Sequence, residues 1–349
     1  MNNFDINKLT RTNVLKMKPY ASARDEFKDF KHEMIYLDAN ENPFDNGLNR
    51  YPDPQQLELK ELIAEKRNVK VENILIGNGS DEVLDLLFRA FCEPNKDNVI
   101  TLPPTYGMYE VLANLNAVEN RAVLLNDDFQ PDAEAILNKT DKNTKILFLC
   151  SPNNPTGNSF SDKIVFDLLS NFNGLILIDE AYIDFSEKDS WLLLLKDYPN
   201  LVICQTLSKA YAMAGVRIGL LYASAKIISI LNKIKPPYNI NVLSQEKAIK
   251  KIQQSTLEFQ VKKIITERER LAKELKKITF IEKVIPSDAN FILIQVDNAN
   301  LRYEQFIKNG IVVRSRSNQP LCDNCLRITV GTKQENEKVI QLLKTVQYA

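Results

Sequence analysis

Between residues 74 and 222 the sequence alternates short apolar runs with longer amphipathic stretches. Amphipathic stretches such as 81–91 and 160–170 favour helices. Strands that alternate with helices are typical of a largely parallel sheet that is covered on both faces. The alternation therefore predicts an α/β fold with a mostly parallel seven-stranded sheet, whose strands lie at 74–77, 98–102, 121–125, 145–150, 174–179, 201–205 and 217–222.

The rest of the chain predicts a second, smaller unit. Residues 223–280 are helical in pattern and rich in lysine. We therefore expect a large domain over residues 46–255 and a small domain over residues 256–349. Residues 1–45 show little strand pattern and are expected to pack with the small domain. The small domain is predicted to be α+β, with strands at 290–296, 311–314 and 326–331 and helices at 299–308 and 333–346.

Charge balance and apolar content limit the classes of partner. The 349 residues include 45 basic and 45 acidic side chains, so neither nucleic acid nor a membrane is expected as a partner. No apolar run approaches the roughly 18 residues of a membrane span, and the residues after Met1 do not resemble a secretory signal. Five cysteines, an odd number, fit a reducing compartment. These features predict a soluble cytoplasmic protein.

Two residue types bear on metal chemistry. His32 is the only histidine, which excludes mechanisms that need two histidines. Cys322 and Cys325 have the spacing of half a zinc site, but no second pair of ligands completes it. We expect the two cysteines to be free thiols in a turn. Catalytic proton transfer must then depend on lysine, tyrosine, aspartate or glutamate.

Reactive side chains follow two of the predicted strands. Lys209 comes shortly after the strand at 201–205, which is an unusual place for a solvated charge, and Asp179 ends the strand at 174–179. Tyr182 follows three residues after Asp179. Ligands bind at the carboxyl ends of the strands in open parallel sheets. An amine that forms a Schiff base, an acid that protonates a ring nitrogen and a phenol are the groups that pyridoxal phosphate needs.

Asp179 and the segment after the first strand each allow a second explanation. A buried carboxylate needs a partner, and a pyridinium N–H or a structural arginine would supply one. The glycine-rich segment 77–81 precedes a predicted helix, whose N-terminus would offer free N–H groups to a phosphate. Capping of that helix by Ser80 or Asp81 explains the segment equally well. Glu82 in the third glycine position departs from the dinucleotide fingerprint.

Three further residues carry groups that suit a phosphate dianion. Thr206 and Ser208 supply hydroxyls beside Lys209, and Arg217 supplies a guanidinium that grips phosphate through two nitrogens. Each of these motifs is weak by itself. Their order along the chain and their places at strand ends together favour a site for a phosphate-bearing cofactor.

The motifs Asn154-Pro155-x-Gly157, Asp179-x-x-Tyr182, Ser208-Lys209 and Arg217 resemble the aminotransferases of fold type I, which depend on pyridoxal phosphate. This resemblance implies an aspartate aminotransferase-like fold. Further segments are similar to the histidinol-phosphate aminotransferase family, and the similarity extends over residues 14–345. These segments are Pro19-Tyr20-x-x-Ala23-Arg24, Asn40-Glu41-Asn42-Pro43, Asn49-Arg50-Tyr51-Pro52, Pro104-Thr105-Tyr106-Gly107-Met108-Tyr109 and Cys325-Leu326-Arg327-Ile328-Thr329-Val330-Gly331-Thr332.

The resemblance implies a role for each matching residue. Lys209 would bond the cofactor covalently, Asp179 would hold the proton on the ring nitrogen, and Tyr182 and Asn154 would contact the ring oxygen O3′. Tyr106 would stack on the ring, whereas Tyr109 is expected to be an ordinary packing aromatic. The cofactor phosphate would be held by Ser80, Asp81, Thr206, Ser208, Arg217 and, from the other subunit of a homodimer, Tyr51. The substrate would be held by Tyr20, Asn154, Arg314 and Arg327.

The family resemblance also implies a reaction. It is the transfer of the amino group of L-histidinol phosphate to 2-oxoglutarate, which gives imidazole-acetol phosphate and L-glutamate in histidine biosynthesis. An aromatic amino acid aminotransferase and a threonine-phosphate decarboxylase share the scaffold and are alternatives. A nucleotide-dependent oxidoreductase and a non-catalytic binding protein are alternatives from other classes.

Overall fold

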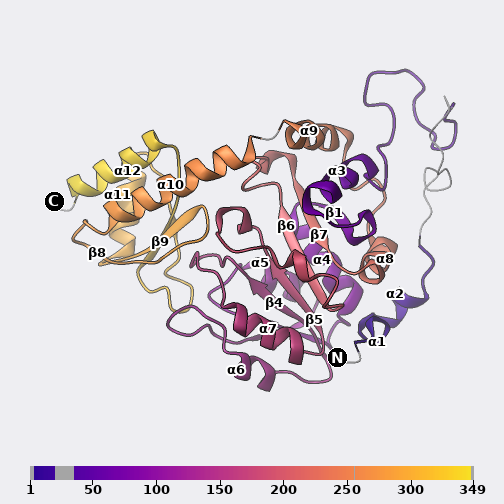
Figure 1. The fold of residues 1–349 in the computed structure, drawn as a ribbon, viewed down its shortest axis with the longest axis horizontal. Coiled ribbons are helices and arrows are strands. Elements are labelled where there is room, and N and C mark those ends of the chain that lie inside the picture. The colour runs from indigo at the N-terminus through magenta and orange to yellow at the C-terminus, as the bar shows by residue number, and fades with distance from the viewer. Residues whose placement is uncertain (1–3, 20–34, 255, 347–349) are drawn as a thin grey trace.

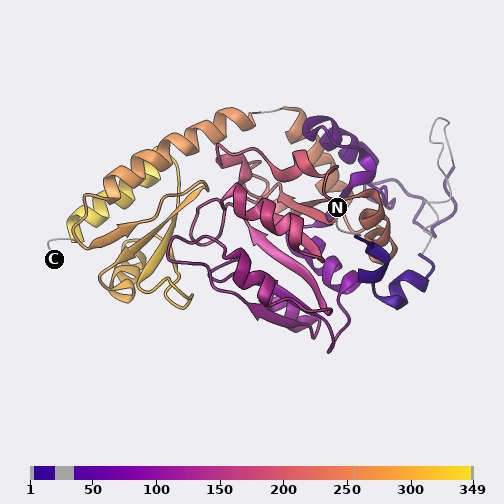
Figure 2. The same ribbon diagram turned by 60° about the horizontal axis from the view of Figure 1, so that its bottom comes forward.

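The structure, a computed structural model, describes residues 4–19, 35–254 and 256–346. Its larger part is built on a seven-stranded sheet in the order β1-β7-β6-β5-β4-β2-β3, and its smaller part on a four-stranded sheet in the order β10-β11-β9-β8. Helix α10 (Leu257–Leu275) extends along both parts (Figures 1 and 2). The boundary between the two domains, predicted at residues 255 and 256, stays a prediction.

The large sheet is mostly parallel, as the sequence predicts. The pairs β2–β3, β2–β4, β4–β5 and β5–β6 are parallel, and β7 runs antiparallel to β6 and β1. The strand predicted at 121–125 begins two residues earlier, because its pairing with β2 starts at Glu119 and ends at Ala122. The strands are β1 (Ile74–Asn78), β2 (Asn98–Thr101), β3 (Glu119–Ala122), β4 (Thr144–Cys150), β5 (Leu175–Asp179), β6 (Leu201–Thr206) and β7 (Ile218–Tyr222).

Helices bury both faces of the large sheet. Leu175 and Leu177 of β5 pack with one set of helices, while Ile176 and Ile178 pack with the other set. Alternate residues of a strand point to opposite faces, so a strand that is apolar throughout is buried on both sides. One face is covered by α4 (Ser80–Phe91), α5 (Met108–Leu115) and α8 (Ala225–Ile234), and the other by α3 (Leu57–Arg67), α6 (Ala133–Asn138), α7 (Asp162–Asn171) and α9 (Val242–Gln253).

The small sheet has two unlike faces. Ile292 and Ile294 of β9 pack against α10, α11 (Ala299–Lys308) and α12 (Lys333–Val346), whereas Phe291 and Leu293 join the core of the large part. The second face of the small sheet therefore lies toward the large domain. The predicted strand at 311–314 is only Arg314–Ser315, where it pairs with β11. The strands are β8 (Ile281–Val284), β9 (Phe291–Val296), β10 (Arg314–Ser315) and β11 (Cys325–Thr329), and all pairs are antiparallel.

The N-terminal helices α1 (Ile6–Leu9) and α2 (Thr12–Lys16) pack on the large domain. Ile6 and Val14 belong to the same buried cluster as the apolar residues of α4 and α8, and the N–H of Arg11 donates to the carbonyl of Ala90 at 3.0 Å. Both helices lie far from the small sheet (Figure 1). The expectation that this segment packs with the small domain is therefore wrong for α1 and α2, because their apolar side chains are buried between α4 and α8.

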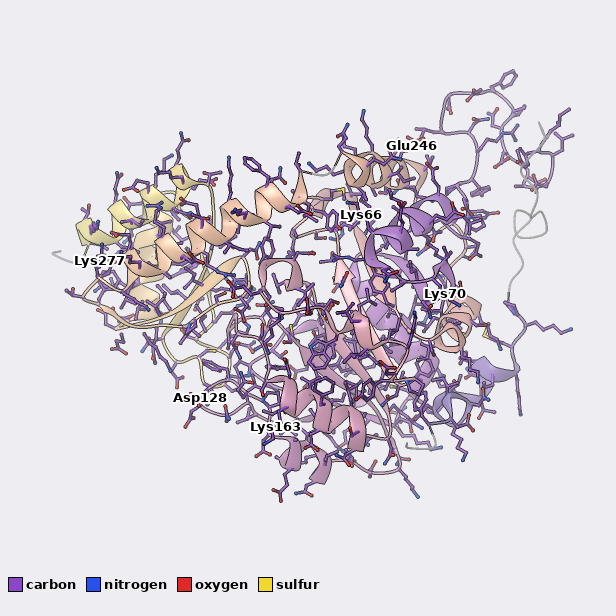
Figure 3. All side chains as sticks on the ribbon, viewed as in Figure 1. Lys66, Lys70, Asp128, Lys163, Glu246 and Lys277 are labelled. Carbon is purple, nitrogen blue, oxygen red and sulfur yellow. The ribbon has the colours of Figure 1, made fainter. Side chains whose placement is uncertain are left out.

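Several charged side chains lie at the surface of the molecule. Glu246, Lys277, Asp128 and Lys163 are exposed, and Figure 3 shows them at its periphery. Within the described ranges, the helices are all too short or too polar to cross a membrane.

Candidate active site

One pocket of the large domain lies where β4, β5 and β6 end. It brings together the residues that the sequence places after separate strands and at the start of α4. Its lining is Ser80, Asp81, Tyr106, Cys150, Asn154, Asp179, Ala181, Tyr182, Thr206, Ser208, Lys209, Ala214 and Arg217. Parallel strands deliver their carboxyl ends to one edge of a sheet, which explains why residues so far apart in sequence share a pocket.

Asp179 ends β5 and is almost completely buried, with 3% of its surface exposed. Burial raises the pKa of its carboxyl to about 6, and hydrogen bonds from the Tyr109 hydroxyl and the Ala181 N–H limit that rise. The Tyr109 hydroxyl lies 2.7 Å from Oδ2, and the Ala181 nitrogen lies 3.1 Å from Oδ1. No lysine or arginine of the described residues forms an ion pair with Asp179, so its partner there is not a structural arginine.

Tyr109 does more than pack. Its ring is completely buried and stacks on Phe148 with a centroid distance of 4.8 Å, while its hydroxyl donates to Asp179. The expectation of an ordinary packing aromatic is therefore incomplete. The sequence contained one signal, since Tyr109 lies one helical turn after Tyr106, but it could not show that the hydroxyl faces β5. Tyr106 itself donates to Oδ1 of Asp81 at 3.0 Å.

Lys209 lies over the ring of Tyr182, with its Nζ 5.7 Å from the ring centroid. Burial, followed by the positive charge of Arg327, lowers the pKa of Lys209, and the charge of Arg217 acts in the same direction. A lower pKa increases the share of neutral, nucleophilic amine. Burial also raises the pKa of Tyr182, so its phenol stays protonated at neutral pH.

The start of α4 and Arg217 form one concave surface of the pocket. The N-cap residue Gly79 has φ +84° and no side chain to cap the helix, so the alternative in which Ser80 or Asp81 is the cap is not observed. A Cβ at Gly79 would collide with the Arg217 guanidinium. Uncapped N–H groups beside a guanidinium form a site for an anion.

Glu82 supports this glycine-rich turn. Its Oε2 accepts a hydrogen bond from the N–H of Asn78 at 2.5 Å and another from Nδ2 of Asn239 at 2.8 Å. The residue that departs from the dinucleotide fingerprint therefore holds the turn in place. In the turn that follows β6, Oγ1 of Thr206 accepts a hydrogen bond from the N–H of Ser208 at 3.1 Å.

These groups fit pyridoxal phosphate. The buried acceptor Asp179 suits a protonated ring nitrogen, the α4 N-terminus with Arg217 suits a phosphate, and the amine of Lys209 suits an aldehyde. The fit rests on the side chains of one pocket, each of which has the chemistry that one part of the cofactor requires.

Among the remaining predicted residues, Arg327 reaches the pocket from the small domain. Its Nη1 donates to Oδ1 of Asn154, and its Cζ lies 5.1 Å from the centroid of Phe291. Arg314 is exposed and lies opposite Arg327 in the β10–β11 ladder. Tyr51 lies outside the pocket, where it stacks on Tyr238 at 4.5 Å. Tyr20 lies outside the described residues. The roles of Tyr51, Tyr20 and Arg314 stay predictions.

Comparisons with known proteins agree with this geometry. The family described as aminotransferase class I and II matches residues 19–343. The histidinol-phosphate aminotransferase of Flavobacterium psychrophilum is 69% identical over 346 residues, which cover 99% of this chain and all of the relative.

Solved structures have the same architecture. The histidinol-phosphate aminotransferase from Clostridium acetobutylicum has a TM-score of 0.79 and 29% identity, and the match covers 86% of this chain and 91% of that one. The enzyme of that name from Sinorhizobium meliloti, solved in complex with pyridoxal-5′-phosphate, has a TM-score of 0.78 at 23% identity over 85% of this chain and 84% of that one, and shows the fold alone. The pocket and the full-length identity together place this chain in the class I and II aminotransferases, within the family of histidinol-phosphate aminotransferases.

Proposed function

We propose that the enzyme transfers the amino group of L-histidinol phosphate to 2-oxoglutarate, with pyridoxal phosphate as cofactor. The products are imidazole-acetol phosphate and L-glutamate, and the reaction belongs to histidine biosynthesis. The observation that carries the proposal is the pocket that joins Lys209, Asp179 and Arg217, in a chain 69% identical over its length to an enzyme of this name.

Asp179 and Tyr182 would control the charge of the bound ring. When bound, pyridoxal phosphate supplies an electrophilic carbon and a ring that accepts electrons. Asp179 is mostly ionised above its pKa of about 6 and would keep a proton on the ring nitrogen. Tyr182, protonated at neutral pH, would donate to O3′ together with the amide of Asn154, and Tyr106 would cover the ring face.

Lys209 would have two tasks. Its Nζ would hold the cofactor covalently, and, once the substrate amine has displaced it, would act as the general base that removes the proton from the substrate Cα. Both tasks need a neutral amine. The lowered pKa of Lys209, caused by burial and then by the charge of Arg327, increases the share of that state.

The phosphate of the cofactor would lie against the start of α4. Ser80 and Asp81 would donate their backbone N–H groups, since the carboxylate of Asp81 already accepts the Tyr106 hydroxyl. The hydroxyl of Ser208 and the guanidinium of Arg217 would add further donors. The Thr206 hydroxyl, which donates to the carbonyl of Ile218 at 3.3 Å, would turn toward the phosphate to add another. A dianion at a helix N-terminus is stabilised by the helix dipole as well as by these bonds.

The anionic end of the substrate would be bound by Arg327 and Arg314. Tyr20 and Asn154 would also contact the substrate. L-Histidinol phosphate carries a phosphate and no carboxylate, whereas L-glutamate carries two carboxylates. A planar guanidinium pairs with both kinds of oxygen array. This explains how one site would accept both substrates in turn.

A homodimer forms part of the proposal, with Tyr51 contacting the cofactor phosphate in the partner subunit. In support, the segment 35–51 extends away from the body of the chain (Figure 1) and exposes large apolar side chains. Ile35 and Leu37 are each 87% exposed, and Phe44 is 81% exposed. Apolar surface of this kind is typical of an interface with another protein chain. Cytoplasmic location, supported by five free cysteines, is proposed as well.

The visible spectrum of the purified enzyme loaded with pyridoxal phosphate tests the proposal. We expect the absorbance of the bound cofactor to fall when L-histidinol phosphate is added and to return with 2-oxoglutarate. If only aromatic amino acids cause the change, the enzyme is an aromatic aminotransferase. Release of carbon dioxide from threonine phosphate would identify a decarboxylase, and a chain that binds no pyridoxal phosphate would contradict the whole proposal.

A further inference from the structure

Three arginines share one face of the small sheet. Arg314 lies directly opposite Arg327 in the β10–β11 ladder. Arg316 follows two residues later and continues the ladder, since its N–H donates to the carbonyl of Cys325 at 2.8 Å. Residues that are opposite each other, or two apart along a strand, point to the same face of a sheet.

This face lies toward the active site. Leu293 pairs with Arg327 in the β9–β11 ladder and belongs to the core of the large domain, whereas the neighbouring Ile292 and Ile294 pack under the helices of the small domain. Arg327 already meets Asn154 of the pocket. Arg316 lies near Tyr182, and it is close enough to Arg327 for the positive charge of Arg327 to lower its pKa.

The three guanidiniums lack counter-charges. Arg314, Arg316 and Arg327 form no ion pair with any carboxylate of the described chain, and the Nε atoms of Arg316 and Arg327 are buried without an acceptor. By contrast, Arg302 and Arg270 of the same domain pair with carboxylates at 2.7 and 2.9 Å.

This lack of partners costs free energy in the absence of a ligand. Burial, followed by the charges of Arg327 and Arg314, lowers the pKa of Arg316 to about 10. Unpaired donors and adjacent like charges in a partly buried place destabilise a fold. An anionic ligand would offset both effects, because it would accept the free N–H groups and neutralise the positive charge.

We infer that Arg316 is a third guanidinium of the substrate site and makes it prefer a phosphate dianion over a carboxylate. This inference rests on the proposed function. A carboxylate has two oxygens, which one or two guanidiniums satisfy, whereas a phosphate has three terminal oxygens and, above a pKa of about 6, nearly two charges. A third guanidinium therefore has a partner on the phosphate and none on the carboxylate.

The test compares Arg316→Gln with Lys308→Gln in the holoenzyme. Lys308 is a matched control, because its exposed side chain on α11 also carries one positive charge in the small domain. For Arg316→Gln we expect kcat/KM for L-histidinol phosphate to fall about 10- to 100-fold, the range for one charge-assisted hydrogen bond. The value for L-glutamate should fall by less than about threefold, as expected when no such bond is lost. Lys308→Gln should change neither value.

Two further measurements separate ligand binding from a structural role. Inorganic phosphate should inhibit the wild-type enzyme by competing with L-histidinol phosphate, and Arg316→Gln should raise its inhibition constant. Without substrate, the melting temperature of Arg316→Gln should be unchanged or higher, because a like charge has been removed. Equal losses with both amino donors, or no loss with either, would overturn the inference.

A failure of the proposed function would look different. If the wild-type enzyme does not turn over L-histidinol phosphate, the proposed function is wrong. The inhibition constants of inorganic phosphate, measured with whichever amino donor is active, would still show whether Arg316 binds a phosphate. Equal inhibition constants of inorganic phosphate for Arg316→Gln and Lys308→Gln would then overturn the assignment of Arg316 as well.

Discussion

At Asp179 two requirements oppose each other within a single side chain. Burial of the carboxyl raises its pKa to about 6, whereas the proposed ion pair with the ring nitrogen of the cofactor requires the ionised form at neutral pH. The Tyr109 hydroxyl resolves part of this conflict, because its hydrogen bond to Oδ2 stabilises the carboxylate. Since Tyr109 is itself completely buried, this hydrogen bond is shielded from competing water.

Substitution of Tyr109→Phe removes this donor and keeps the ring stacked on Phe148. The hydrogen bond lowers the pKa of Asp179, so its loss raises that pKa. Activity that needs the carboxylate then falls at the acid end of the range and recovers as the pH rises. We expect the acid limb of kcat/KM to move up by about one pH unit, which is the pKa shift that corresponds to the free energy of one such hydrogen bond.

The pH–rate profiles of wild type, Tyr109→Phe and Tyr106→Phe provide the measurement. Tyr106→Phe is the control, because it also removes a pocket hydroxyl, but one that donates to Asp81. Its acid limb should stay where the wild-type limb lies. An unchanged acid limb in Tyr109→Phe would show that the hydroxyl does not control the ionisation of Asp179.

At the scale of elements, the turn between β1 and α4 depends on Gly79. Its φ of +84° is strained for any other residue, and a Cβ would also collide with Arg217. We predict that Gly79→Ala destabilises the protein by about 1 kcal/mol through its backbone alone, and weakens pyridoxal phosphate binding about tenfold or more because Arg217 is displaced.

Gly310→Ala is the matched control. Gly310 also has a positive φ, of +73°, but no atom lies within 4 Å of the added Cβ. Urea denaturation should show a similar loss of stability in both variants, while a spectral titration should show weakened cofactor binding in Gly79→Ala alone. Equal cofactor affinity in the two variants would mean that the position of the Arg217 guanidinium beside Gly79 is not required for cofactor binding.

For the whole molecule, the proposed dimer predicts complementation between inactive chains. Lys209→Ala lacks the amine proposed to be catalytic, and Tyr51→Ala lacks the side chain proposed to reach the partner. In a mixed dimer, one of the two sites would receive Lys209 from one chain and Tyr51 from the other. Equal mixing of subunits should therefore restore up to about a quarter of the wild-type activity, since half of the dimers are mixed and each has one intact site.

The measurement is activity after the two variants have been unfolded together and refolded, with each variant refolded alone as the control. If Tyr51 acts within its own chain, the mixture stays as inactive as its components. Size-exclusion chromatography of each variant would confirm that the refolded chains have the size of a dimer before the activities are compared.

The interior strands could be predicted because burial on both faces makes them apolar throughout. β4, β5 and β6 lie within a residue of their expected places. The edge strands β3 and β10 could be placed less well, since β3 has no fully buried residue and β10 has only two residues. The places of α1 and α2 also could not be read from local sequence, because many apolar surfaces would accept Ile6 and Val14.

The sequence alone determined the α/β class, the family and the pocket residues at the strand ends, since these depend on local patterns and short motifs. Tertiary structure decided which side chains meet. Tyr109 and Asp179 lie 70 residues apart, and Arg327 and Asn154 lie 173 apart. Such contacts depend on how sheets and helices pack, and no local pattern encodes the direction of a side chain across a domain boundary. For the same reason, only the register of β10 and β11 placed Arg314 and Arg316 beside Arg327.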